Sequence, residues 1–268
     1  MMDMKGIKRL MLTALLPIFM AAPLLAQHDM HVVILGDSNT SIGGDDCSQS
    51  KGWSKWFKLS FKPLSCRSYA RSGATWTHTA LTKEDTAENT GKLSDNNVIY
   101  NQVLRLRDAV QKGQQPVPGL IIIAAGTNDA WFVDSRKDAF SKSAVILADS
   151  LDFIMRKPIG DIRSLPEAVG YSCGRLREWY PDAKIFLLTP MQATCIPEEL
   201  IQKAGNLIER SANWLGAYAV RQDGPEFIEV EMENQKKTRT QDGIHTNEYG
   251  ARRNGEHLTR VISRMLQP

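Results

Sequence analysis

The chain has 268 residues, of which 42% are hydrophobic and 24% are charged, which is typical of a folded protein and excludes a disordered, collagen-like or multi-span membrane chain. The formal net charge is +3, but the first 26 positions hold three of the 33 basic residues and one of the 30 acidic residues. The remaining body therefore carries 30 basic and 29 acidic residues, a net charge of +1. Because binding to a phosphate backbone needs a basic surplus, we expect no nucleic-acid partner.

Residues 1–26 have the three parts of a secretory signal peptide. A basic segment from Lys5 to Arg9 precedes an apolar stretch from Leu10 to Met20, and a tail of small and apolar residues ends at Ala26. The stretch is shorter than the roughly 20 apolar residues that a spanning helix needs. We predict cleavage near Ala26, a periplasmic or secreted protein, and no stable membrane insertion after cleavage.

Export would place the four cysteines in an oxidising compartment, where they could form up to two disulfides. Three pairings are possible, the spacing does not choose among them, and buried free thiols fit the sequence equally well. The sequence contains no C-x-x-C motif, so we expect no zinc or other metal site. The cysteines are Cys47, Cys66, Cys173 and Cys195.

Short apolar runs alternate with longer amphipathic stretches after residue 26, which indicates a parallel sheet covered by helices on both faces. The predicted strands are Met30 to Leu35, Leu64 to Ala70, Leu120 to Ala125, Lys184 to Thr189 and Phe227 to Glu231. The predicted helices are Trp53 to Phe61, Val98 to Gln111, Leu165 to Tyr180, Pro197 to Ala219 and Glu248 to Leu266. No linker or repeat divides this body, so we predict one α/β domain over residues 27–268.

The segment from Ala130 to Arg163 is too long for a simple connection between two of these elements. Long excursions at strand ends often shape a binding cleft. Extra helices that only cover the sheet would explain the segment equally well. The sequence therefore leaves both readings of this segment open.

Polar residues follow three of the predicted strands directly, at the ends where open α/β sheets bind ligands. Ser38 follows the first strand within Gly36-Asp37-Ser38, Gly73 follows the second, and Asn128 follows the third. The Asn128 amide could donate a hydrogen bond to an oxygen that gains negative charge. Gly73 has no Cβ, so its N–H can approach a bound group closely. Ordinary turns and helix caps use the same residue types.

An acid and an imidazole lie three residues apart near the C-terminus, in Asp242-Gly243-Ile244-His245. On a compact loop the Asp242 carboxylate can reach one ring nitrogen of His245 and fix its tautomer, which leaves the other nitrogen free to take a proton. An Asp-Gly turn ahead of a helix would explain the turn but not the histidine. His28, His31 and His257 are expected to be surface or core residues.

In this order the four segments resemble the SGNH, or GDSL, hydrolase family, whose name records Ser, Gly, Asn and His from four separate blocks. The resemblance extends over the whole exported chain. It implies a three-layer α/β/α, flavodoxin-like fold with a mainly parallel five-stranded sheet. The matching segments are Gly36-Asp37-Ser38, Ser72-Gly73, Gly126-Thr127-Asn128-Asp129 and Asp242-Gly243-Ile244-His245.

The resemblance also implies a serine esterase with Ser38 as nucleophile, His245 as general base and then acid, and Asp242 as the group that orients the histidine. The oxyanion hole would combine the N–H groups of Ser38 and Gly73 with the side-chain amide of Asn128. No metal or cofactor is implied.

The chain departs from the family pattern at a few positions. Ser68 and Ala70 stand in the second block where the family often has Asn and a Gly or Ser, and Asn39 stands where the family name has Leu. Other motifs fit less well. Thr40 occupies the position of the last glycine in a G-x-S-x-G elbow, and residues 36–44 do not form a G-x-G-x-x-G pattern.

Clues to the substrate come from two indoles. Trp76 follows the Gly73 loop and Trp131 follows the Asn128 loop, so both could stack on a sugar, although a buried tryptophan is common in cores. Together with export, this favours removal of acyl groups such as acetate from a carbohydrate. The alternatives are a lysophospholipase or lipase-like acylhydrolase, a sugar O-acyltransferase, and a non-catalytic glycan-binding protein on the same fold.

Overall fold

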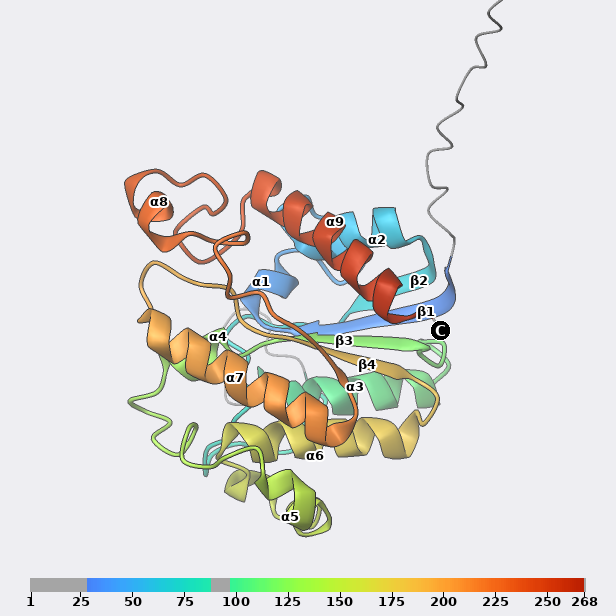
Figure 1. Ribbon diagram of the computed structural model, residues 1–268. Coiled ribbons are helices and arrows are strands. Elements are labelled where there is room, and N and C mark those ends of the chain that lie inside the picture. Colours follow the sequence, from blue (N-terminus) through green and yellow to red (C-terminus); the bar gives the residue numbers. More distant parts are fainter. Residues whose placement is uncertain (1–27, 88–96, 268) are drawn as a thin grey trace, which may run out of the picture.

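The computed structural model describes residues 28–87 and 97–267, so the predicted signal peptide lies outside the described residues. A single five-stranded sheet runs through the centre of this part, in the order β2-β1-β3-β4-β5, and every pairing is parallel (Figure 1). The predicted α/β fold is thereby confirmed. The strands are β1 (His28–Gly36), β2 (Pro63–Ser68), β3 (Leu120–Ala124), β4 (Lys184–Leu188) and β5 (Tyr218–Val220).

Helices cover both faces of the sheet and form the outer layers (Figure 1). On one face α2 and α9 pack against each other, and on the other face α3, α6 and α7 lie against the sheet, with α5 outside α6. The helices are α1 (Ser38–Ser41), α2 (Trp53–Phe61), α3 (Ile99–Gln111), α4 (Thr127–Trp131), α5 (Ile146–Ile154), the 3-10 helix η2 (Ile159–Asp161), α6 (Leu165–Trp179), α7 (Glu198–Leu215), α8 (Val230–Gln235) and α9 (Glu248–Met265).

The central strands are apolar at consecutive positions because both of their faces are buried. Ile34 and Ile122 point into the core under α2 and α9, whereas Leu35 and Ile123 point into the core under α3, α6 and α7. All four side chains are fully buried, and each burial contributes about 1.5–3 kcal/mol. The hydrophobic layers on both sides therefore fix β1 and β3 as the centre of the sheet.

The fifth strand was predicted in the wrong place. Gly216 ends α7 with a left-handed φ of +60°, so the chain leaves the helix and Tyr218–Val220 pairs with β4. Phe227 and Ile228, in the predicted strand, are buried together with Met191, and α8 begins at Val230. The apolar residues Phe227 and Ile228 are buried as expected, but they pack in a small cluster beside the sheet and do not form a strand of it.

The long segment after α4 adds a helix to the outer layer and also lines a cleft. Its helix α5 packs on α6 and extends the outer layer. Residues 134–138 line a cleft of about 290 Å³ together with His78, Thr79 and Arg163. Among the helices of residues 28–87 and 97–267, none is both long and apolar enough to span a membrane.

A carboxyl group is buried immediately after β1. Asp37 is 2% exposed and caps α1, where its side chain accepts a hydrogen bond from the Asn39 N–H at 3.1 Å. Burial raises the pKa of Asp37 from 3.8 to about 6, although hydrogen bonds from Asn39 and Thr127 and the nearby His245 oppose the rise. The folded protein therefore binds this proton more tightly than the unfolded chain does.

We expect Asp37→Asn to increase the free energy of unfolding at pH 7.5, because the variant no longer buries a charge at this position. Since the pKa is about 6 when folded and 3.8 when unfolded, the contribution of Asp37 to stability falls as the pH rises through this window, by an amount on the order of 3 kcal/mol. The difference between the two proteins should therefore shrink as the pH falls from 7 to 4. Chemical denaturation at several pH values measures it, and a difference independent of pH would contradict the prediction.

The four cysteines are free thiols, and they lie on both sides of the sheet. Cys47 and Cys66 are buried under α2 and α9 with their Sγ atoms 3.6 Å apart, whereas Cys173 is buried on the opposite face and Cys195 is exposed. The hydrogen bond from Cys66 lowers the pKa of the Cys47 thiol, while the same contact and burial raise that of Cys66. Burial raises the pKa of Cys173 to about 12.

Mild oxidation of the folded protein with diamide should join Cys47 to Cys66 and leave Cys173 as a thiol, because the sheet separates Cys173 from the pair. Peptide mapping without reduction measures the linkage. Cys66→Ser is the control and should yield no intramolecular bridge. A disulfide bond that involves Cys173, formed while the protein is folded, would contradict the prediction.

Candidate active site

The predicted site residues gather where the strand order of the sheet reverses. Strand β1 has β2 on one side and β3 on the other, and the crevice outside the carboxyl ends at such a point is the usual ligand site of an open α/β sheet. Strand β1 leads through Asp37 into Ser38, the first residue of α1. Strand β3 leads through Gly126 into α4, which carries Asn128.

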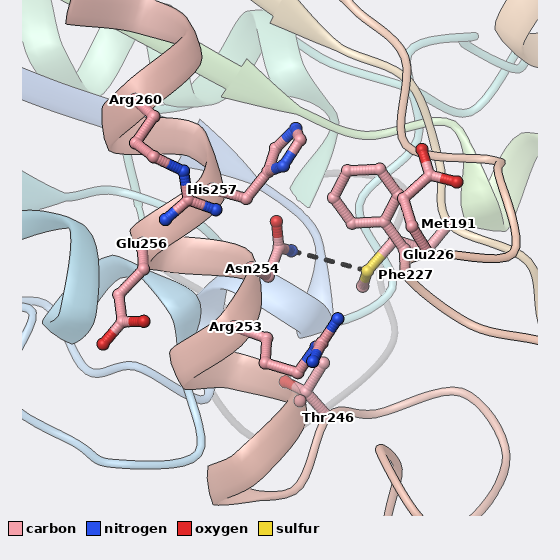
Figure 2. Close-up of a pocket in the computed structure, with 10 residues that line it drawn as sticks. Met191, Glu226, Phe227, Thr246, Arg253, Asn254, Glu256, His257 and Arg260 are labelled. Carbon is pink, nitrogen blue, oxygen red and sulfur yellow. Dashed lines mark hydrogen bonds between the residues drawn. The ribbon is translucent and has the colours of Figure 1, made fainter.

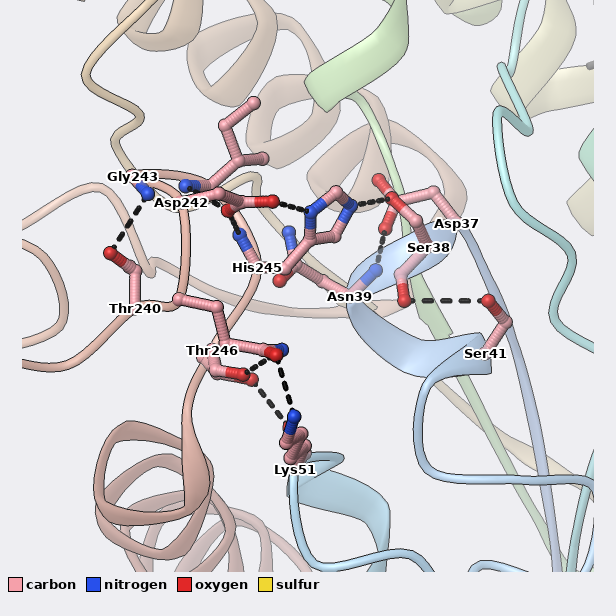
Figure 3. A network of polar contacts seen from close by, with 12 residues as sticks. Asp37, Ser38, Asn39, Ser41, Lys51, Thr240, Asp242, Gly243, His245 and Thr246 are labelled. Carbon is pink, nitrogen blue, oxygen red and sulfur yellow. Dashed lines mark hydrogen bonds and ion pairs between the residues drawn. The ribbon is translucent and has the colours of Figure 1, made fainter. Parts of the chain in front are cut away.

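A serine, a histidine and an aspartate form a hydrogen-bonded row at this edge (Figure 3). The Ser38 Oγ lies 2.9 Å from Nε2 of His245, and Nδ1 of His245 lies 2.6 Å from Oδ2 of Asp242. With the Asp242 carboxylate ionised, the proton is held on Nδ1 and Nε2 can accept the hydroxyl proton of Ser38. The structure thus brings together the three residues that the sequence singled out.

The Asp242 carboxylate also fixes the backbone of its own loop. Its Oδ1 accepts hydrogen bonds from the N–H groups of Ile244 at 3.0 Å and His245 at 2.8 Å. Desolvation alone would raise the pKa of Asp242, but the hydrogen bonds from the His245 ring and from these two N–H groups outweigh it and lower the pKa. Asp242 is therefore an anion at neutral pH, as a partner of the imidazole must be.

A buried carboxylate holds the chain just before Asp242. Glu233, only 1% exposed, accepts hydrogen bonds from the backbone N–H groups of residues 238, 239 and 240 and from the Thr238 and Thr240 hydroxyls. These hydrogen bonds outweigh its desolvation, so the pKa of Glu233 is lowered. On the other side of the loop, Gly243 has φ +95°, and a Cβ there would lie 2.0 Å from Oγ1 of Thr194. Both contacts constrain the loop that carries Asp242 and His245.

The loop after β2 is fastened to the start of α4. Gly73 has φ +74°, a conformation that favours glycine. One residue later, the Ala74 carbonyl accepts a hydrogen bond from Nδ2 of Asn128 at 2.9 Å. The adjacent Asp129 accepts from the N–H groups of Trp76 and Thr77, both at 2.9 Å. Gly73 and Asn128 are thereby held on neighbouring segments at the same edge of the sheet.

The structure contradicts the assignment of Trp76 to substrate stacking. Its side chain is completely buried, and its Nε1 donates to the Ala125 carbonyl at 3.2 Å, so no face of the indole is open to a ligand. Trp76 is a core residue under the Gly73 loop. Trp131 differs, because it is 45% exposed at the end of α4 and stacks on Phe132 with centroids 6.0 Å apart.

A separate cleft of about 200 Å³ lies between α9 and the segment that contains Glu226 and Phe227 (Figure 2). Arg253, His257 and Arg260 line one side of it. Thr246, which follows His245 in the chain, also lines it, but Ser38, Asp242 and His245 do not. Within residues 28–87 and 97–267, no group of three or more His, Cys, Asp or Glu side chains is arranged to hold a metal ion.

Buried polar groups that bond the backbone around the site carry no recognisable motif in the sequence. Glu233 and Gln102 both lie on helices, where a glutamate or glutamine usually faces solvent, and the Gly126-Thr127-Asn128-Asp129 motif does not indicate which backbone groups Asp129 bonds. The sequence signal for burial of Gln102 was its spacing, because it lies three residues after Ile99 and so on the same face of the helix. That spacing indicates burial but does not identify the partner.

The chain is similar to known proteins over a range that includes all of these site residues. The family model of GDSL-like lipases and acylhydrolases matches residues 34–253. No curated protein sequence matches the chain significantly.

Solved structures share the fold at low sequence identity. A protein from Lactobacillus plantarum matches with TM-score 0.59 and 12% identity, covering 90% of this chain and 100% of its own. A member of the lipolytic G-D-S-L family from Veillonella parvula has TM-score 0.51 and 12% identity, covering 87% and 98%. An acetyl xylan esterase has TM-score 0.51 and 15% identity, covering 88% and 100%. The family model spans most of the chain, and the chain belongs to the GDSL-like lipase/acylhydrolase family of ester hydrolases.

Proposed function

We propose that the protein is a serine esterase whose nucleophile is Ser38, and the observation that carries this proposal is the row from Ser38 through His245 to Asp242. The Ser38 Oγ attacks the ester carbonyl carbon while its proton moves to Nε2 of His245. The bond to the alcohol oxygen then breaks, and His245 returns the proton to that oxygen. Water hydrolyses the acyl-serine by the same two proton transfers.

Three donors would stabilise the oxyanion, namely the N–H groups of Ser38 and Gly73 and the side-chain amide of Asn128. The position of Asn128 supports this role. Its Nδ2 donates one hydrogen to Ala74, next to Gly73, and an amide nitrogen carries a second hydrogen. That second hydrogen is the one assigned to the oxyanion.

An acetylated carbohydrate is the substrate class that we favour. The exposed Trp131 lies three residues after Asn128 and offers an indole face to a sugar ring. The cleft lined by residues 134–138 continues the same segment of chain. The solved acetyl xylan esterase shares the fold. Residues 1–26 carry the predicted export signal, which would place the single domain of residues 27–268 outside the cytoplasm, where such glycans occur.

The alternatives differ in what they predict for the same protein. A lipase-like acylhydrolase would prefer esters of long acyl chains, and an O-acyltransferase would transfer the acyl group to an added sugar in preference to water. A glycan-binding protein would leave Ser38 unreactive to a fluorophosphonate probe. Assays with p-nitrophenyl esters of increasing chain length, with and without a sugar acceptor, separate these cases.

Ser38→Ala should reduce turnover of p-nitrophenyl acetate by on the order of 10⁶-fold, because it removes the nucleophile. Asn128→Ala should reduce kcat by about 10² to 10³-fold, because two of the three oxyanion donors remain. Steady-state kinetics measure both effects.

A fluorophosphonate should label the wild type at Ser38 and fail to label Ser38→Ala, as mass spectrometry can show. Equal activity of wild type and Ser38→Ala would refute the proposed nucleophile. Full activity of Asn128→Ala would remove that side chain from the oxyanion hole.

Trp131→Ala should raise KM for an acetylated xylo-oligosaccharide by about 3- to 10-fold, the loss expected for one stacked ring. The kinetics with p-nitrophenyl acetate should stay unchanged, because that ester has no sugar to stack. Trp214→Ala is the matched control. Trp214 is 52% exposed, but it lies at the end of α7 remote from the carboxyl edge of the sheet. An equal effect of both substitutions would contradict a sugar platform at Trp131.

A further inference from the structure

The carboxyl end of β1 lacks a strand partner on one side. Strand β2 ends at the register Ile34 with Ser68, and among the described residues the Gly36 N–H has no backbone acceptor on that side. Gly36, two residues after Ile34, directs both its N–H and its C=O toward the β2 side, because the two groups of one residue point the same way in a strand. Gly36 lies two residues before Ser38, so its support bears on the nucleophile.

The side-chain amide of Gln102 fills this place in the manner of a peptide group. Its Oε1 accepts the Gly36 N–H at 2.8 Å, and its Nε2 donates to the Gly36 carbonyl at 2.9 Å. Gln102 is fully buried on α3. The Gly36 carbonyl also accepts from the backbone N–H of Arg71 at 3.0 Å, and the Ile34 carbonyl accepts from that of Tyr69 at 2.8 Å, so the chain just after β2 still contacts β1.

The same amide is linked to the loop that carries Gly73. Its Nε2 also donates to the Asn97 carbonyl at 3.2 Å, and Nδ2 of Asn97 donates to the Ser72 carbonyl at 3.3 Å. Ser72 immediately precedes Gly73. Two buried amides therefore connect the backbone two residues before Ser38 with the backbone one residue before Gly73.

We infer that Gln102 is a positioning residue that sets the spacing between the Ser38 and Gly73 N–H groups of the oxyanion hole. The inference rests on the proposed function, since the spacing matters only if an oxyanion binds there. Gln102 does not touch the substrate. Loss of its amide would let the two donors drift apart, and small misplacements of such donors are costly because their effect depends on fixed geometry.

The test compares Gln102→Met, which keeps the length of the side chain but removes the amide, with a matched variant on the same helix. Asn101 is also fully buried, but its amide bonds the Lys83 carbonyl at 2.8 Å and the Asp85 N–H at 3.3 Å, in another loop. Asn101→Leu should therefore lower the Tm without changing catalysis, with kcat within about 2-fold of wild type.

For Gln102→Met we expect kcat on p-nitrophenyl acetate to fall by about 10- to 100-fold while KM changes by less than about 2-fold. A boronic acid that forms a tetrahedral adduct with Ser38 should lose affinity by a similar factor, because its oxygen occupies the oxyanion position. A general loss of stability would not produce this separation of kcat from KM.

Asn97→Ala removes the hydrogen bond to the Ser72 carbonyl and keeps the pair of hydrogen bonds between Gln102 and Gly36, so it should show a smaller fall in kcat of the same kind. If Gln102→Met does not melt cooperatively, the kcat of Asn97→Ala tests whether this network positions the oxyanion donors. Unchanged kcat and boronate affinity in a folded Gln102 or Asn97 variant would overturn the inference while leaving the esterase intact. A wild type that neither hydrolyses the ester nor reacts at Ser38 would overturn the proposed function, and the inference with it.

Discussion

The close pairing of β1 with β3 at their carboxyl ends is the constraint on which the site depends. Gly36 pairs in register with Ala124, and a Cβ at position 36 would lie 2.5 Å from the Ala124 carbonyl oxygen and 2.8 Å from Oγ1 of Thr40. Only glycine therefore lets β3 and α1 approach the strand this closely. The turn through Asp37 follows at once, and it sets the serine at the mouth of the crevice where the strand order reverses.

Buried polar side chains hold the loops around that crevice, one for each loop. Gln102 supports the end of β1, Asp129 supports the loop after β2, and Glu233 supports the loop before Asp242. In each case a side chain bonds backbone groups that no strand or helix satisfies. Such groups would be costly if buried alone. Loops without regular structure thereby gain fixed positions, which a site that depends on donor geometry requires.

The parts of this arrangement that are local in sequence could be predicted. Ser38, Gly73 and Asn128 follow apolar strands within a few residues, so parallel strand ends bring them to one edge, and Asp242 reaches His245 within one turn of chain. The position of β5 could not be predicted from hydrophobicity, because Tyr218–Val220 is short and Phe227 is more apolar; only Gly216 marked the boundary. Trp76 could not be separated from Trp131, because composition does not tell a buried indole from an exposed one. The roles of Gln102 and Glu233 depend on partners far away in the chain.

The distance along the chain between the two ends of the site has a consequence for its assembly. Ser38 and His245 are 207 residues apart, and they come within 2.9 Å only when the C-terminal part of the chain has folded back beside the N-terminal part. Helix α9, which follows His245, packs along α2, which follows Ser38, and this contact closes the layer above the site. A chain that is still emerging from the ribosome therefore contains Ser38 without His245, the base proposed for it. Reactivity of the proposed nucleophile Ser38 would therefore report that the chain has folded to its C-terminal part.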